Sequence, residues 1–190
     1  IFDVVLSSQV KIMDLKNLSI EELVKQISPS SPVIQELTRR GVIRKTKRGE
    51  PNRNYTGNIG EYFAIRFYND LDLNLYKCTK ELPKLKREED ENSQDIDAKS
   101  ESGDGYSIKT VSSPSGTTGS FWDPKSIENN IQKFKYLIIP ILDKSFQVDK
   151  ILELTWDEFI QNKKYNKRMQ NYNISLTKTI VSKFTIISKI

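Results

Sequence analysis

The chain has 190 residues, of which 36% are hydrophobic and 29% are charged, and these proportions predict one soluble globular domain with a single core. Thirty Lys and Arg residues against 25 Asp and Glu residues give a formal net charge of +5, which permits a polyanionic partner without requiring one. The sequence has no histidine and one cysteine, Cys78. This composition excludes Ser/His/Asp triads, Cys/His catalysis and classical zinc sites.

A reducing, cytoplasmic location is expected. Cys78 cannot form a disulfide within the chain, and no apolar run approaches the roughly 18 to 20 residues that a membrane span needs. Residues 1–10 also lack the charged region and the small-residue cleavage site of a signal peptide.

Two short helices are predicted near the N-terminus. Ser19 and Glu22 have the spacing of a capping box, and an apolar stripe follows them to Ile27. A second helix is predicted with Ser31 as its cap and Pro32 in its first position, running to Arg40 before Gly41. We therefore expect a helical extension over residues 1–41 and a core over residues 42–190, within one domain.

A third helix is predicted to begin near Asn58, with Glu61 in its first turn and outside its apolar stripe. The apolar residues that recur at helical spacing are Ile59, Tyr62, Phe63 and Phe67. An acid in a first turn is favourable for the helix dipole, so Glu61 has a purely structural explanation as well as a functional one.

The remainder predicts a mixed α/β (or α+β) fold with a central mixed sheet flanked by helices. Strands are expected over residues 73–79, 96–100, 106–110, 135–142 and 146–154, with one or two more within 173–190. Residues 80–93 are expected to form an exposed loop, and Asp123 and Thr155 to cap two further helices.

The stretch ESGDG, residues 101–105, has the residue types of a reversal and predicts a hairpin between the strands on either side. Side chains alternate along a strand, so Asp95, Asp97 and Lys99 are expected on one face of the first strand, and Ser107 and Lys109 on one face of the second. A carboxylate and an ammonium group would then lie close together. Such acids and lysines on a hairpin are also typical of a solvated surface.

Glu61 in GEYFA, Asp97 in DIDA and Lys109 in YSIKT resemble the PD-(D/E)xK nuclease superfamily in order and approximate spacing. More narrowly, the pattern over residues 39–142 is similar to small restriction-endonuclease-like proteins of bacterial defence systems. The resemblance implies a restriction-endonuclease-like core and a Mg²⁺ cofactor, with Mn²⁺ as a substitute.

Carried over by position, the resemblance implies that Asp97 is the principal metal ligand, with Asp95 as the alternative. Glu61 would complete the metal site, and Ile108 is included in the metal set. Lys109 would be the catalytic lysine that orients the attacking water. Ser107 stands where the superfamily has Glu or Asp, and it would act as a hydrogen-bond donor behind the metal ligands.

A basic run over residues 39–54 is expected to contact the DNA backbone, or else to be a solvated loop. Its cationic residues are Arg39, Arg40, Arg44, Lys45, Lys47, Arg48 and Arg53, against the single acid Glu50. Ser112 and Ser113 begin a small-residue loop, residues 112–122, that could also contact phosphates.

The function expected from these features is Mg²⁺-dependent hydrolysis of double-stranded DNA by a restriction-type endonuclease, as a homodimer if both strands are cut. Three alternatives remain open: a catalytically inactive DNA-binding module, a DNA repair nuclease, and an interaction domain whose basic loop binds an acidic protein.

Overall fold

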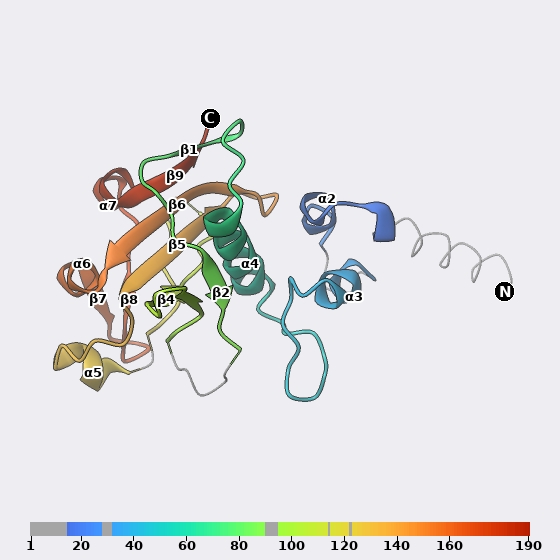
Figure 1. The fold of residues 1–190 in the computed structure, drawn as a ribbon. Coiled ribbons are helices and arrows are strands. Elements are labelled where there is room, and N and C mark those ends of the chain that lie inside the picture. Colours follow the sequence, from blue (N-terminus) through green and yellow to red (C-terminus); the bar gives the residue numbers. More distant parts are fainter. Residues whose placement is uncertain (1–14, 28–31, 90–94, 114, 122) are drawn as a thin grey trace, which may run out of the picture.

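The computed structural model describes residues 15–27, 32–89, 95–113, 115–121 and 123–190. Within these residues the chain is a mixed α/β structure built on a seven-stranded sheet in the order β1-β9-β6-β5-β4-β3-β2 (Figure 1). Strands β4 and β5 are parallel, and all other neighbours in this sheet are antiparallel. The strands are β1 Tyr76–Cys78, β2 Leu85–Arg87, β3 Ala98–Ser100, β4 Gly105–Ile108, β5 Tyr136–Leu142, β6 Val148–Thr155 and β9 Thr185–Lys189. A separate two-stranded sheet consists of β7 Lys163–Asn166 and β8 Asn171–Ile174.

Strand β5 forms the centre of the core, as its apolar run predicts. Leu137, Ile139 and Ile141 belong to the hydrophobic cluster on one face of the sheet. Ile138 and Leu142 alternate with them and belong to the cluster on the other face. The sheet therefore needs helices on both faces.

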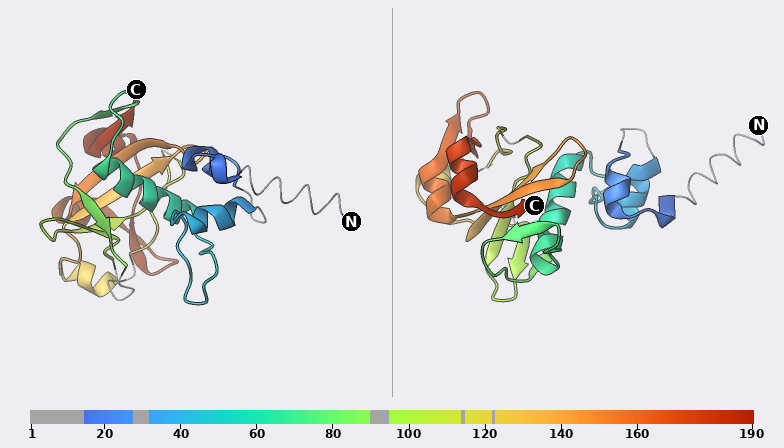
Figure 2. Two further views of the ribbon diagram at one scale, coloured as in Figure 1. Left: turned by 45° about the vertical axis from the view of Figure 1, so that its right-hand side comes forward. Right: turned by 90° about the horizontal axis from the view of Figure 1, so that it is seen from above.

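Helices cover both faces of the sheet in layers (Figures 1 and 2). Helix α4 lies across one face, with α2 and α3 beyond it, whereas α6 and α7 pack on the other face. The helices are α2 Ile20–Val24, α3 Pro32–Arg39, α4 Tyr55–Asn69, α5 Pro124–Glu128, α6 Trp156–Asn162 and α7 Lys178–Phe184. The coarse fold class is thus confirmed as mixed α/β with a mixed sheet flanked by helices.

Side-chain caps set several helix starts as predicted. Ser19 and Glu22 form a complete capping box at α2, and Asp123 caps α5. Thr155 caps α6 in the same reciprocal way with Glu158. At the end of α3, Gly41 has a φ of 74°, the left-handed conformation that glycine adopts readily.

Helix α4 begins at Tyr55, three residues before the predicted start near Asn58, and Asn54 caps it. The Asn54 side chain accepts a hydrogen bond from the Gly57 amide at 3.1 Å. Glu61 consequently lies in the second turn of α4. Stabilisation of an acidic residue by the helix dipole is confined to the first turn, so it does not explain why Glu61 stands here.

Several other sequence predictions were wrong. The expected loop 80–93 contains β2, a three-residue strand that pairs with β3. Within the C-terminal segment expected to be strands, Thr177 caps helix α7, and β-branched residues obscured its apolar spacing. Strand β7 was not predicted either. Asp95 has a φ of 75° and precedes the strand, so it does not share a β3 face with Asp97 and Lys99.

Trp156 and Phe159 are buried core residues, as predicted, whereas Trp122 lies outside the described residues. In the described part of the chain, no helix has both the length and the apolar character that crossing a membrane requires.

Gly60 lets α4 approach the chain that follows β4. A Cβ atom at this position would lie 2.2 Å from Oγ1 and 2.3 Å from Cγ2 of Thr110. Thr110 also donates a hydrogen bond from its hydroxyl to the Gly57 carbonyl, at 3.3 Å. The second turn of α4, with Glu61, is thereby held against the end of the hairpin.

We expect Gly60→Ala to destabilise the protein by about 1–3 kcal/mol in urea unfolding, because the added methyl group must displace Thr110 or the helix. The same change in an unobstructed helix would stabilise it by up to about 1 kcal/mol. Gly119→Ala is the control, since a Cβ there meets no atom within 4 Å. A gain in stability on Gly60→Ala would contradict the close approach.

Candidate functional site

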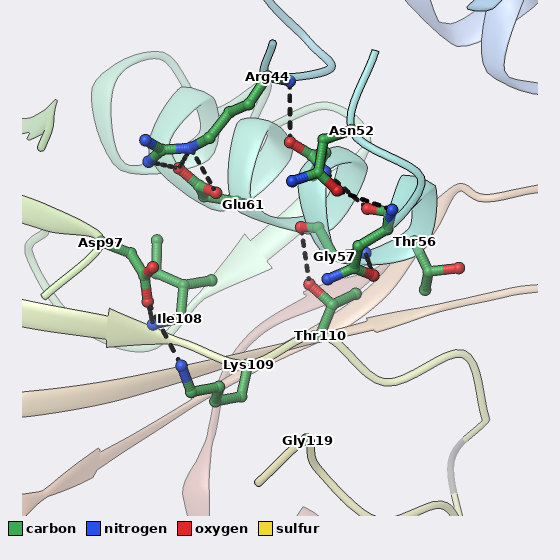
Figure 3. A pocket seen from close by; sticks show the side chains of 12 residues that line it. Arg44, Asn52, Thr56, Gly57, Glu61, Asp97, Ile108, Lys109, Thr110 and Gly119 are labelled. Carbon is green, nitrogen blue, oxygen red and sulfur yellow. Dashed lines mark hydrogen bonds and ion pairs between the residues drawn. The ribbon is translucent and has the colours of Figure 1, made fainter. Parts of the chain in front are cut away.

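A cavity of about 480 Å³ lies where the first two turns of α4 face the end of the β3–β4 hairpin (Figure 3). Three chain segments contribute its charged side chains: Arg44 comes from the loop before α4, Glu61 from α4, and Asp97 and Lys109 from the hairpin. We call this space the site cavity. It brings together Glu61, Asp97 and Lys109, the three residues that the superfamily resemblance selects.

Asp97 is fixed by the hairpin. Its backbone N–H donates to the Tyr106 carbonyl at 2.8 Å, and its Oδ2 accepts a hydrogen bond from the Ile108 amide at 2.7 Å. Burial raises the pKa of Asp97 above its usual value, a shift that Lys109 and the Ile108 amide only partly offset. The carboxylate therefore lacks full compensation for its negative charge.

Lys109 follows β4 directly and reaches the same carboxylate. Its Nζ lies 3.9 Å from Oδ2 of Asp97 and 5.5 Å from the ring centroid of Phe121. The backbone N–H of Lys109 donates to the Ile138 carbonyl at 3.0 Å, so the residue starts from the rigid centre of the sheet. The ammonium group of Lys109 therefore lies at the cavity, and its ion pair with Asp97 is a long one.

Glu61 is held much more strongly, by two arginines. Arg87 donates from Nε to Oε1 of Glu61 at 2.6 Å, and Arg44 donates to the same oxygen from Nη2. Among the described residues, the other oxygen, Oε2, receives only a long 3.3 Å hydrogen bond from Nε of Arg44. One carboxylate thus pairs with two guanidinium groups. Oε2 can still accept a further hydrogen bond or coordinate a cation.

Both arginines are anchored at a second point. The guanidinium group of Arg44 donates to the Glu88 carbonyl at 3.1 Å, and the backbone N–H of Arg44 donates to Oδ1 of Asn58 at 2.9 Å. Nη1 of Arg87 donates to the Gly41 carbonyl at 2.7 Å. Burial lowers the pKa of Arg44, but its bonds to Glu61 outweigh burial and the pKa is raised overall, so Arg44 stays charged.

The other predicted hairpin residues are placed differently. Ile108 lines the site cavity, whereas Ser107 and Asp95 are not among the described residues that line it. Ser107 is fully buried, and its hydroxyl has no hydrogen-bond partner within the described residues.

The predicted DNA-contacting residues are placed in different surroundings, and Arg44 among them lines the site cavity. Arg39 and Arg40 both pair with Glu36, and Arg40 also donates to the carbonyls of Leu15 and Leu18, so these two stabilise the helical extension. Lys45, Lys47, Arg48 and Arg53, on the loop between α3 and α4, are exposed, as are Ser112 and Arg39, while Ser113 is partly exposed.

Sequence reasoning missed Arg87 and Thr110, which shape the site. Arg87 lies in the segment predicted to be an exposed loop, and a single basic residue among many gave no signal of its partner. The β2–β3 register, in which Arg87 is opposite Ala98, is what brings it to Glu61.

Asp97 and Glu61 offer oxygen ligands that suit a hard divalent cation such as Mg²⁺, which proteins bind through one or two carboxylates together with substrate phosphates. No cluster of three or more acidic, His or Cys side chains able to hold a metal occurs among the described residues. The under-compensated charge of Asp97 and the open Oε2 of Glu61 fit a sparse site of that kind.

We expect the effect of Asp97→Asn on stability to depend on pH. Because the pKa of Asp97 is raised on folding, the folded state binds more protons than the unfolded state, and wild-type stability falls as pH rises from about 3.9 through the raised pKa. Asp97→Asn removes this loss, so the unfolding free energy of the variant relative to wild type should increase with pH in urea titrations.

Asp104→Asn provides the matched control for that experiment. A hydrogen bond from Lys135 lowers the pKa of Asp104, so its stabilising contribution is present above the unfolded pKa and is lost as pH falls. The relative stability of this variant should therefore decrease with rising pH. The same direction for both variants would contradict the burial of Asp97.

No protein-family model matches the chain, and no curated protein sequence matches it.

Proposed function

We propose that the protein is a Mg²⁺-dependent endodeoxyribonuclease of the restriction type that hydrolyses phosphodiester bonds in double-stranded DNA. The observation that supports this most is the meeting of Asp97, Lys109 and Glu61 in one cavity. Asp97 directly precedes β3 and Lys109 directly follows β4, while Glu61 comes from a helix that Gly60 lets approach the end of the hairpin.

Asp97 and Glu61 would hold the metal, which when bound polarises the scissile phosphate and offsets charge in the transition state. Lys109 has two tasks in this scheme. Its ammonium group, 3.9 Å from Asp97, orients the attacking water, and it offsets negative charge that develops on the phosphoryl oxygens.

Arg44 and Arg87 would keep Glu61 in a fixed position and leave Oε2 directed to the metal. The exposed cations Lys45, Arg48 and Arg53, on the loop before α4, would contact the DNA backbone next to the site cavity. Cleavage of both strands needs two such sites, and a homodimer supplies them.

The proposal predicts that the protein cuts plasmid DNA in Mg²⁺ or Mn²⁺, and that Asp97→Asn and Lys109→Gln each lower the rate by at least about 100-fold. Gel assays with methylated and unmethylated plasmid measure the rate, and discrete fragments would indicate restriction-type specificity. Lys99→Gln is the control, because Lys99 lies on the same hairpin but pairs with Glu88 and does not line the site cavity. Equal cleavage by wild type and Asp97→Asn would refute the assigned roles.

A catalytically inactive DNA-binding module is the second candidate. Two observations favour it: Glu61 is already neutralised by two arginines, and the buried Ser107 occupies the position where the superfamily has an acid. This alternative predicts salt-dependent DNA binding by the wild type with no cleavage in either metal.

A further inference from the structure

A second cavity, of about 630 Å³, adjoins the site cavity and shares Arg44 and Asn52 with it. We call it the basic cavity. Its charged lining residues are Arg44, Lys45, Lys47, Arg87 and Glu89, so four cations face one acid among the described residues that line it. The site cavity, in contrast, contains both carboxylates that could hold a metal.

Among the described residues, the two arginines that line the basic cavity share one acidic partner. Arg44 and Arg87 both pair with the one carboxylate of Glu61, which can neutralise only one of them. Nη2 of Arg87 is moreover buried with no hydrogen-bond partner within the described residues. The guanidinium and ammonium groups that line the cavity, rather than this enclosed atom, make the region suited to an anion.

The walls of the basic cavity are ordered by backbone hydrogen bonds. In the loop before α4, the Asn52 amide donates to the Arg44 carbonyl at 2.8 Å and the Thr46 amide donates to the Glu50 carbonyl at 2.7 Å. Lys45 is bridged to Pro51 in this small hairpin. Lys45 therefore emerges from a fixed frame beside the arginines.

We propose that the basic cavity is a subsite for a phosphate group of the nucleic-acid backbone, and that it holds the strand so that a neighbouring phosphate enters the site cavity. This inference rests on the proposed function and adds to it a discrete anchoring point. Guanidinium and ammonium groups bind phosphate oxygens, and Arg44 lines both cavities.

The test measures binding of a fluorescein-labelled DNA duplex by anisotropy, without divalent metal, over a series of NaCl concentrations. Each lysine that contacts a phosphate contributes about 1 to the slope of log K against log salt. Lys45→Gln should therefore reduce the slope by about 1 and weaken binding. Glu89→Gln should tighten binding, because it removes the acid that would repel the phosphate.

Lys86→Gln is the matched control, since Lys86 is exposed and precedes Arg87 on β2 but does not line the basic cavity. Its slope should equal that of the wild type. The subsite is wrong if Lys45→Gln reduces the slope no more than Lys86→Gln does, or if Glu89→Gln fails to tighten binding. Because no metal is present, these outcomes are independent of whether the protein cleaves DNA.

Discussion

The carboxylate of Glu61 is the point on which the geometry of both cavities depends. It accepts hydrogen bonds from Arg44, on the loop before α4, and from Arg87, at the end of β2, so one buried group joins three chain segments. Removing one partner of a buried ion pair typically costs about 3–5 kcal/mol, because the remaining charge is left without compensation. The two arginines extend this connection to the Gly41 and Glu88 carbonyls. Loop, helix and edge strand are thus held in one arrangement around the site cavity.

The two carboxylates of the site cavity have different environments, so they would contribute differently to the binding of a cation. Glu61 is surrounded by guanidinium donors, whereas Asp97 has one backbone amide and a long contact to Lys109. Burial raises the pKa of Asp97 because these groups do not fully offset the loss of water. A divalent cation would supply the missing compensation at Asp97, while Glu61 would contribute a fixed oxygen beside it. The incompletely compensated carboxylate of Asp97 would thus lower the stability of the metal-free protein and, for the same reason, would favour binding of a cation.

Local chemistry made much of the fold predictable, and long-range contacts explain what was not. The hairpin around residues 101–105, the central strand β5 and the capping boxes at Ser19 and Thr155 all follow from residue types a few positions apart. The partners of Glu61 are 17 and 26 residues away from it in the sequence, and no periodicity indicates them. Strand β2 has three residues, two of them charged, so its sequence cannot be distinguished from that of a loop, and the position of Arg87 could not be predicted. Glu61, Asp97 and Lys109 were named from their resemblance to a superfamily pattern, and only the structure shows that they lie close together.

The burial of Ser107 limits which residues could supply acidic ligands at the site cavity. A carboxylate at this buried position of β4 would be desolvated at a large cost in free energy, since the Ser107 hydroxyl finds no hydrogen-bond partner among the described residues. In the proposed function, the acidic groups for a metal would therefore be Asp97 and Glu61 among the described lining residues. The availability of Glu61 depends in turn on Arg44, which also lines the basic cavity. A phosphate bound there would compensate Arg44 in place of Glu61, and the charge released on Glu61 would favour a cation at the site cavity. Under the proposed function, binding of a backbone phosphate and binding of the metal would therefore be coupled through Arg44 and Glu61.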